Sequence, residues 1–586
     1  MRTASAALCA AGVVFWATAP PPADARSPVA IEGVDKTQRE AILDLLPDRD
    51  RPTTLFEAER ISEEAAARAL AWLRSEGYYA AEVTPEAQED PPLARLRIAP
   101  GQRFRFVAPD VVFDGAAPND LAAYEARAII ARISPGAPAR AADVLQTEAD
   151  AVAALQAAGY ADAAAGERRV VVDHATMTMK AEFHLNAGGL ARLGDVRVEP
   201  ANVFRREFLV HLRNWRPGAT YKPDNLTRLR RDLSSTGAVS SVTTHLDPPN
   251  AQGERDVVIQ IEPAKRNSYE FGAGYSTTEG ASVDAQWTQR NFTGRADALT
   301  LSTTLGELAQ SATVSWVRPH ASGAGRTRHT SLTVLHEDTA AYSHRGIALS
   351  SGVDADRKLR LGFSYGAELS ADNYNQTAGG VTNAYVLSGF GDLRRDTTGE
   401  PLDARHGSIL DFRLEPSVSV GDATVAFTRF IGEGRLYESF AANDRFTIAA
   451  RTKLGWIVPV SGSADDVPPD HRFYAGGGGS VRGYEYNSIY PHERDALGLS
   501  PGGQGVFEVS TEARVRFADR FGAAAFVDGG NAFDQWRDAA ELKWGVGVGL
   551  RYDLGFAPLR VDVARALDRG PDDPAYAIYI SLGQAF

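Results

Sequence analysis

One glycine-rich stretch contains the residues whose types and spacing most suggest a site of chemistry. Residues 473–484 read Phe-Tyr-Ala-Gly-Gly-Gly-Gly-Ser-Val-Arg-Gly-Tyr. The stretch is not a phosphate-binding loop, because no lysine follows its glycines, and it is not a GxSxG nucleophile motif, because residue 482 is arginine. Taken alone, a glycine run is typical of a flexible extracellular loop. A guanidinium, however, offers a planar fork of donors that binds two carboxylates at once, so the chemistry available to this motif is ion pairing.

No other pattern in the sequence predicts catalysis. The eleven histidines are scattered, and no HExxH motif occurs among them. Sets of serine, histidine and aspartate are not distinguishable from ordinary polar residues. We therefore expect no enzyme activity, no cofactor, and no catalytic, cofactor-binding or metal-binding residues.

The elements around the glycine-rich stretch alternate with a period of two residues. In residues 543–554 apolar side chains alternate with glycine, arginine and aspartate, which predicts a strand whose two sides meet different solvents. Sixteen such runs follow residue 266, and an even number of strands of about ten residues is typical of membrane barrels. The runs begin near Tyr269, Ala281, Ala298, Ser311, Arg328, Arg345, Arg357, Asn383, His406, Ala426, Arg445, Gly505, Arg520, Lys543, Leu559 and Ala575.

We predict a 16-stranded antiparallel transmembrane β-barrel over residues 267–586. A soluble sandwich would show similar alternation, but two observations favour the barrel. Aromatic residues at the strand ends suit the two membrane interfaces. The charges and glycines of the polar side suit a watery lumen.

The first half of the chain repeats one pattern three times. A strand, two helices and two strands recur with a period of about 80 residues, and the second helix of each repeat closes on Gly77, Gly159 or Gly237. This predicts three β-α-α-β-β modules of the α+β class, at residues 26–102, 103–188 and 189–266. One irregular domain with coincidental glycines is the alternative. Exposed sheet edges in such modules suit peptide binding better than catalysis.

The first 25 residues are typical of a secretory signal peptide. Arg2 precedes a short apolar run that ends at residues 20–25 in Pro-Pro-Pro-Ala-Asp-Ala, and cleavage is expected after Ala25. The one cysteine, Cys9, lies in this segment, so the mature chain contains neither disulfides nor thiolate metal sites. Its position early in the apolar run disfavours a lipoprotein. No apolar run in the sequence is long enough for a helical membrane span.

The composition describes a folded chain without affinity for nucleic acid. Of 586 residues, 44% are hydrophobic and 23% are charged, which excludes a disordered or fibrous chain. The 62 basic residues face 75 acidic ones, and the net charge is −13. Because both halves of the chain are net acidic, we expect no nucleic-acid partner.

The glycine-rich stretch resembles the signature of the bacterial outer-membrane assembly superfamily, of the BamA and TamA type. The signature residues are Val481, Arg482, Gly483 and Tyr484, in a long connection before the twelfth strand. Residues 502–504 followed by Glu512, and the run 526–534 containing Asp528, resemble the motifs of the next two strands. The resemblance implies that the loop folds back into the barrel and that Arg482 pairs with both carboxylates. Successive side chains of a strand point to opposite faces, and this alternation independently places both carboxylates on the lumen side.

The resemblance extends to the modules and to the partners. The modules resemble POTRA domains, and three of them ahead of sixteen strands look most like the TamA branch, the outer-membrane subunit of the translocation and assembly module. The resemblance implies an outer-membrane location with the modules in the periplasm. It also implies a TamB-like inner-membrane-anchored partner, unfolded outer-membrane client proteins and outer-membrane lipid. The implied function is an insertase or translocation factor for β-barrel and autotransporter-type proteins.

The first and last strands are expected to meet at a weak seam, where residues 269–275 pair with residues 576–586. The seam residues are Tyr269, Phe271, Gly272, Gly274, Tyr576, Ile580, Gly583 and Phe586. Glycines weaken strand pairing. The apolar residues at alternate positions of the last strand resemble an outer-membrane sorting signal. By resemblance, the seam opens sideways to release a client strand into lipid. The alternatives are a tightly closed seam and a two-partner secretion transporter that passes an unfolded client through the lumen.

Overall fold

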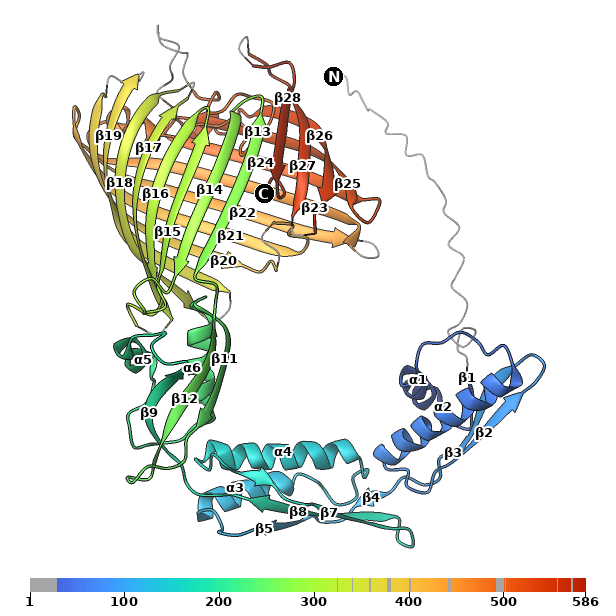
Figure 1. The fold of residues 1–586 in the computed structure, drawn as a ribbon. Coiled ribbons are helices and arrows are strands. Elements are labelled where there is room, and N and C mark those ends of the chain that lie inside the picture. The colour runs from blue at the N-terminus through green and yellow to red at the C-terminus, as the bar shows by residue number, and fades with distance from the viewer. Residues whose placement is uncertain are drawn as a thin grey trace. The chain divides into compact units, whose positions relative to one another are not determined.

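The computed structural model describes residues 29–586 apart from short gaps. The gaps are residues 324, 340, 358–359, 377–380, 400–401, 441–443, 492–499, 501, 556 and 571–572. The predicted signal peptide with Cys9 lies outside the described residues. None of the helices in the described ranges has the length and apolarity needed to cross a membrane. The chain divides into two compact units, one holding the first two sheets and the other holding the barrel (Figure 1).

The first sheet has the strand order β1-β3-β2 and lies with two helices in the same segment. Its elements are β1 (Val29–Glu32), α1 (Lys36–Asp44), α2 (Leu55–Ser75), β2 (Glu82–Gln88) and β3 (Leu93–Ala99). Helix α1 starts at a capping box, in which Asp35 and Gln38 satisfy each other's backbone N–H groups. Ile42, Leu73 and Leu96 are fully buried in the core between sheet and helices.

The second sheet forms around its longest strand, β8, which pairs with all the others. Its elements are β4 (Arg105–Phe106), β5 (Asp110–Phe113), α3 (Asp120–Ile130), α4 (Ala141–Ala157), β6 (Ala164–Ala165), β7 (Arg169–Asp173) and β8 (Thr178–Asn186). Ile130, Leu155 and Phe183 share its buried core. The predicted strand-helix-helix-strand-strand order is present, with β4 and β6 as additional two-residue strands.

The third sheet has the order β10-β9-β12-β11. Its elements are β9 (Arg192–Glu199), α5 (Arg206–Leu212), β10 (Ala219–Thr220), α6 (Pro223–Ser234), β11 (Val239–Leu246) and β12 (Glu254–Pro263). The order again follows the predicted pattern, with β10 as the additional strand. The boundaries proposed between the modules stay predictions.

Residues of α5 and α6 and their flanking loops dock on two connections of the barrel. The backbone N–H of Arg205 donates to the carbonyl of Gly294 at 2.7 Å, in the β14–β15 connection. His211 Nε2 donates to the carbonyl of His320 at 2.8 Å, and His320 Nε2 donates to the carbonyl of Asp232 at 2.9 Å, in the β16–β17 connection. These three bonds fix this part of the third module to the barrel end at which the chain enters.

A closed antiparallel barrel of sixteen strands follows, which confirms the predicted fold class (Figure 1). The strands are β13 (Asn267–Ser276), β14 (Gly280–Arg290), β15 (Ala298–Gly306), β16 (Ala309–Arg318), β17 (Arg326–Asp338), β18 (Ser343–Arg357), β19 (Leu361–Gln376), β20 (Asn383–Asp396), β21 (Gly407–Gly421), β22 (Val425–Phe440), β23 (Phe446–Ser461), β24 (Gly505–Arg516), β25 (Phe521–Phe533), β26 (Lys543–Asp553), β27 (Pro558–Ala566) and β28 (Ala577–Leu582). Every strand begins within four residues of its predicted start.

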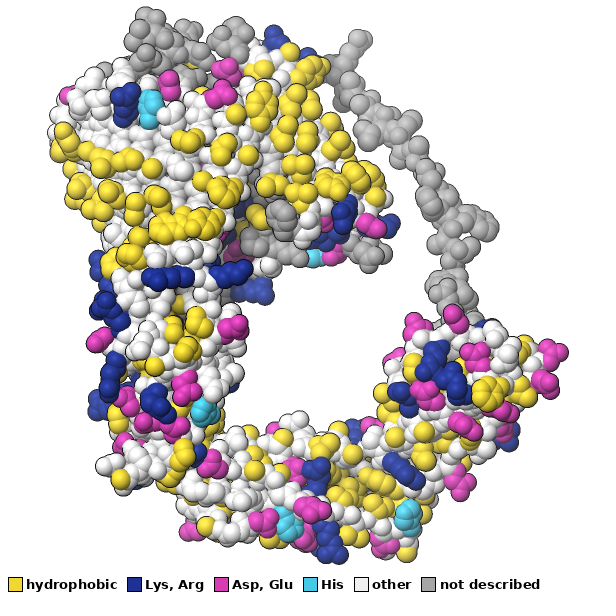
Figure 2. Space-filling view, in the orientation of Figure 1, with side chains coloured by type: hydrophobic (Ala, Val, Ile, Leu, Met, Phe, Trp, Pro, Cys, Tyr) yellow, Lys and Arg dark blue, Asp and Glu magenta, His cyan; other side chains and the backbone are white. Residues whose placement is uncertain are grey.

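The two sides of the barrel wall differ as the alternation predicts. Outward-facing Val548 and Leu550 are 63% and 64% exposed. In contrast, Glu512 and Asp528 point inward and are buried. On the face shown in Figure 2, hydrophobic side chains gather over the barrel strands. An apolar outer surface of this extent is stable against hydrocarbon rather than water.

We predict that Gly366→Ala on β19 destabilises the barrel. An added Cβ would lie 2.4 Å from Phe390 Cζ and 2.4 Å from the carbonyl oxygen of Ser351, and such overpacking costs about 1–3 kcal/mol. The measurement is the midpoint of heat-induced unfolding in detergent. Gly432→Ala on β22 is the matched control, because a Cβ there meets no atom within 4 Å. Equal midpoints for the two variants would contradict the prediction.

Candidate functional site

The long connection between β23 and β24 forms the core of the candidate site, because it folds back into the barrel. Two short backbone ladders shape it: Phe473 and Gly503 exchange hydrogen bonds at 3.0 and 2.8 Å, and Ala475 and Ile489 exchange bonds at 3.1 and 2.9 Å. Val481 in the same loop is completely buried. The described part of the loop therefore packs into the interior of the barrel, as the resemblance implied, and its contacts run to residues of β24 to β28.

Arg482 at the loop's tip is held by a fork of hydrogen bonds. Its Nε donates to Asp528 Oδ2 at 2.7 Å and its Nη2 donates to Asp528 Oδ1 at 3.0 Å, which is the bidentate geometry that a guanidinium favours. Its Nη1 donates to Glu512 Oε2 at 3.0 Å. The structure thus brings together the three charged residues that the sequence singled out, on the loop, β24 and β25.

A third carboxylate completes the arrangement, and sequence reasoning missed it. Arg482 Nη1 also donates to Asp562 Oδ2 on β27, at 3.1 Å. Asp562 is fully buried and stands between Val561 and Val563, which face outward and mark it as inward by parity. That signal was available in the sequence, but only the strand register brings β27 close to the loop.

The buried charges form one network rather than isolated pairs. Arg514 Nε and Arg551 Nη2 donate to Glu512 Oε1 at 2.9 and 3.0 Å, and Arg551 Nη1 donates to Asp562 Oδ1 at 2.5 Å. Burial lowers the pKa of Arg482, but Asp528 and Glu512 raise it by more, so the guanidinium stays charged. Unpaired charges at this depth are strongly disfavoured, so each member of the network depends on the others.

Glycine and aromatic residues give Arg482 the space that it needs. The guanidinium lies over the ring of Phe526, with Cζ 3.3 Å from the ring centroid. A Cβ at Gly545 on β26 would lie 2.0 Å from the Arg482 carbonyl oxygen, so the loop backbone approaches the wall only where the wall lacks a side chain. Gly483 has a φ of +103°, a conformation that favours glycine. The glycines at positions 483 and 545 and the ring of Phe526 therefore leave room for the loop in this one position.

The remaining motif residues anchor the loop on both sides of Arg482. The Gly483 N–H donates to the hydroxyl oxygen of Tyr579 on β28 at 3.0 Å, and the Tyr484 hydroxyl donates to the carbonyl of Trp544 on β26 at 3.1 Å. Val481 packs into an apolar cluster of loop and wall residues. The cluster contains Val425, Phe427, Ile457, Val467, Phe473, Ala475, Val481, Tyr484, Ile489, Val506 and Ala566. The prediction of a watery lumen is therefore wrong on this side, where the loop builds a small apolar core.

The seam between the first and last strands is short. Strand β13 pairs with β28 at two positions, Tyr275 with Ile580 and Ser276 with Tyr579, whereas β13 and β14 share ten pairs. Of the predicted seam residues, Ile580 lies in this register. Four others lie on β13 before the paired positions, namely Tyr269, Phe271, Gly272 and Gly274. Tyr576 precedes β28 and is exposed.

The C-terminal residues leave the seam, which corrects the predicted position of Phe586. Gly583 has a φ of +86°, and its N–H donates to the carbonyl of Pro558 at 2.8 Å. The left-handed residue turns the chain inward, so alternation no longer applies beyond it. Gln584 Nε2 then donates to Asp403 Oδ1 at 2.9 Å, and Phe586 packs on a buried cluster of Ala404, Ile409, Tyr437 and Ala449. Phe586 therefore faces the interior rather than lipid.

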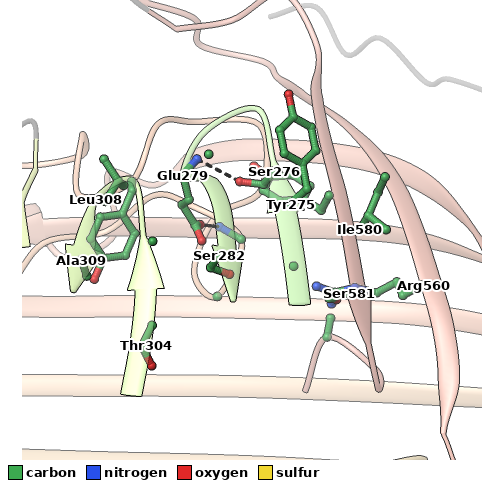
Figure 3. A pocket seen from close by; sticks show the side chains of 18 of the residues that line it. Tyr275, Ser276, Glu279, Ser282, Thr304, Leu308, Ala309, Arg560, Ile580 and Ser581 are labelled. Atoms are coloured by element: carbon green, nitrogen blue, oxygen red, sulfur yellow. Dashed lines mark hydrogen bonds between the residues drawn. The ribbon is translucent and has the colours of Figure 1, made fainter. Parts of the chain in front are cut away.

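A cavity of about 410 Å³ lies behind the seam, and the loop borders it (Figure 3). Residues of the first strand, the last strands and the loop line it, including Ser276, Glu279, Ser581 and Gly478. The Gly478 N–H donates to Glu279 Oε1 at 2.7 Å, next to the β13 side of the seam. Since Gly483 binds Tyr579 on the β28 side, the loop bridges the seam from within.

Comparisons with known proteins agree with this architecture. The model of the Omp85 superfamily domain matches residues 291–586. The chain is similar to the outer membrane protein assembly factor BamA of Nitratidesulfovibrio vulgaris, with 23% identity over 63% of this chain and 48% of the relative. It is also similar to BamA of Neisseria meningitidis serogroup B, with 20% identity over 70% of this chain and 58% of the relative. The chain thus spans about half the length of these curated relatives.

A solved structure shares the fold. The crystal structure of BamA from Haemophilus ducreyi lacking POTRA domains 1–3 aligns with a TM-score of 0.68 and 16% sequence identity. The alignment covers 82% of this chain and all of that one. At this identity the likeness establishes the barrel fold with its preceding modules.

We predict that Arg482→Ala frees the loop without dissolving the barrel. Removing one partner of a buried charge network costs about 3–5 kcal/mol, because Glu512, Asp528 and Asp562 lose a shared donor. The measurements are protease cleavage within residues 462–504 and the midpoint of heat-induced unfolding in detergent. We expect faster cleavage of the loop and a lower unfolding midpoint than in the unmodified protein.

Arg394→Ala is the matched control, because the Arg394 side chain is 50% exposed and its pair with Asp411, at 3.1 Å, is open to solvent. Exposed pairs contribute only about 0–1 kcal/mol, so this variant is expected to behave like the unmodified protein. Unchanged cleavage of the Arg482→Ala loop would show that the network does not hold it.

Proposed function

The chain belongs to the Omp85 superfamily, and from this premise we propose that it assembles or exports client proteins at the outer membrane through its lateral seam. It is an outer-membrane β-barrel with POTRA-like modules in the periplasm. The observation that carries the proposal is the two-pair register between β13 and β28. A client strand that enters the lipid needs an exposed strand edge to pair with. Among the strand pairs of the described barrel, β13 and β28 share the fewest register pairs, so exposing an edge there breaks the fewest backbone hydrogen bonds.

The energetic contrast between the seam and the rest of the wall supports this route. Each backbone hydrogen bond contributes about 0.5–1.5 kcal/mol, so a two-pair register opens far more readily than the ten-pair register of β13 and β14. Residues 267–274 of β13 pair with β14 but have no register partner on β28. These residues are a preformed edge on which an incoming strand forms its first hydrogen bonds.

The loop links the state of the seam to the interior of the barrel. Its bonds from Gly478 to Glu279 and from Gly483 to Tyr579 act across the short register. In the proposed mechanism the Gly478–Glu279 bond breaks when the seam opens, while the Gly483–Tyr579 bond and the Arg482 network keep the loop on β24 to β28. The lock thus fixes one wall of the opening, and the β13 side moves.

A two-partner secretion mechanism, with an unfolded client passing through the lumen, is the second candidate. The loop and the C-terminal residues both lie inside the barrel in the described structure. A threaded chain would have to displace the buried Arg482 network as well as Phe586. This arrangement favours the seam over the lumen as the exit route.

We propose a TamB-like, inner-membrane-anchored periplasmic protein as the partner, with unfolded outer-membrane proteins of the β-barrel and autotransporter type as clients and outer-membrane lipid as the surrounding phase. The sequence resemblance supports this assignment. The first periplasmic sheet adds a physical reason, since β2 is an edge strand, and an edge strand can pair with an extended segment. The proposed activity is assembly and involves no bond chemistry, so no enzyme activity is proposed.

We predict that a disulfide between Tyr275→Cys and Ile580→Cys stops client assembly. These two residues are direct register partners on β13 and β28, and both face outward, which is the geometry that permits a cross-strand disulfide. The sequence contains one cysteine, Cys9 in the predicted signal peptide, so no other thiol of the mature chain competes. The measurement is client insertion by the purified protein in lipid vesicles, before and after reduction.

The matched control is a disulfide between Leu301→Cys and Val314→Cys. These residues are also direct partners that face outward, but they lie on β15 and β16 within the continuous wall. The seam disulfide is expected to abolish insertion until it is reduced, and the control disulfide is expected to leave insertion unchanged. Full insertion with the seam locked would refute lateral opening.

We also predict that the full-length protein, cross-linked in cells and purified, carries a large inner-membrane-anchored protein. The partner is identified by mass spectrometry of the cross-linked band. A deletion of residues 29–102 tests whether the first periplasmic sheet takes part in the contact. Recovery of a secreted client with no anchored protein would favour the two-partner secretion mechanism.

A further inference from the structure

A second cluster of chemistry-bearing side chains lies away from the Arg482 network. It contains His344 on β18, Asp372 on β19 and Asp470 in the long loop. One ligand atom from each residue lies within 4.8 Å of the corresponding atoms of the others, and His344 Nε2 is 3.5 Å from Asp372 Oδ1. Residues from two strands and a loop thus converge on one point of the interior.

The histidine at this point is buried and has no hydrogen-bond partner. His344 is 3% exposed, and neither of its ring nitrogens is hydrogen-bonded in the described structure. Leaving a buried polar group unsatisfied costs about 1–3 kcal/mol, so such a group in a folded protein indicates a missing partner. Both nitrogens face carboxylates, with Nδ1 3.8 Å from Glu337 Oε2.

The surroundings hold these side chains in place as outer-shell groups hold metal ligands. Ser370 Oγ donates to Asp372 Oδ2 at 2.6 Å, which leaves Oδ1 facing the imidazole. The Tyr374 hydroxyl donates to Asp470 Oδ1 at 2.5 Å, and the Tyr374 ring stacks on His344 with centroids 5.2 Å apart. Hydrogen bonds of this kind orient ligands and tune their basicity in known metal sites.

We propose that His344, Asp372 and Asp470 bind a divalent transition-metal ion of the zinc class. An imidazole with two carboxylates suits Zn²⁺, whereas Mg²⁺ and Ca²⁺ prefer oxygen ligands alone. Bonds of about 2.0–2.2 Å in a tetrahedral site place ligand atoms about 3.4 Å apart. The 3.5 Å separation of His344 and Asp372 fits this value, and the remaining distances, up to 4.8 Å, close with small side-chain rotations.

Charge and access both agree with a cation at this point. The carboxylates of Asp372, Asp470 and Glu337 lie around His344, and on its other side Asp470 faces His471, with His471 Nε2 3.9 Å from Asp470 Oδ2. Acidic groups outnumber the histidines here, so a divalent ion offsets negative charge. The Asp470 side chain is 20% exposed, which gives an ion a route from water.

Binding there would give the long loop a second anchor, independent of the proposed transport activity. Arg482 attaches the loop to β24, β25 and β27, whereas Asp470 would attach it to β18 and β19 through the ion. The two anchors lie on different walls of the barrel. Metal binding would therefore decrease the mobility of the loop between them.

The test uses the full-length protein in detergent, stripped with EDTA and titrated with ZnCl₂ in a calorimeter. One Zn²⁺ per chain is expected, together with slower protease cleavage within residues 462–504. His344→Gln and Asp470→Asn are each expected to weaken binding by about 100-fold or more, since loss of an outer-shell group alone costs about 10- to 100-fold. Asp470→Asn lies in the loop, so it remains informative if the His344 variant fails to fold.

His329→Gln is the matched control. His329 is another barrel histidine, and it faces the single carboxylate of Asp354 at 3.2 Å. This variant is expected to bind Zn²⁺ like the unmodified protein. Absence of zinc binding, or equal binding by all variants, would overturn the proposal. Loop protection that follows pH and ignores Zn²⁺ would also overturn it, and would assign the cluster to a protonated His344 paired with its carboxylates.

Discussion

The interior of this barrel depends on the ion pairs that the buried guanidinium of Arg482 forms with three carboxylates. Glu512, Asp528 and Asp562 belong to three strands, and each would be a desolvated negative charge without a shared donor. The same contact fixes the tip of the long loop, so it also sets where Val481 and Tyr484 enter the apolar cluster. Charge neutralisation and apolar packing therefore require the same position of the loop.

The Arg482 network and the seam between β13 and β28 differ in how strongly they are held together. The network links Arg482 to three carboxylates and is buried, which makes rearrangement costly. The register of β13 and β28 is short, and single hydrogen bonds from the loop supplement it. In the proposed mechanism, motion is therefore confined to the boundary between β13 and β28, while the neighbouring strands keep their geometry.

Much of the fold was predictable because a barrel wall separates two solvents. Alternation located the strands to within a few residues, and the same parity placed Glu512 and Asp528 inside. Asp562 has the same parity, but choosing it among all inward charges requires the register of strands far apart in the sequence. The His344 cluster was not predictable for the same reason, since its members meet only through the closed barrel and the folded loop.

Phe586 was misplaced because parity assumes a continuous strand, and Gly583 ends that continuity with a left-handed turn. The interior position of Phe586 constrains the order in which the strands fold. The surface that receives Phe586 comes from β21, β22, β23 and the connection before them, so it does not exist until those strands have joined. Docking of Phe586 therefore requires that β21, β22 and β23 have already joined. A bulky group attached next to Phe586 would lie inside the barrel and compete with this docking.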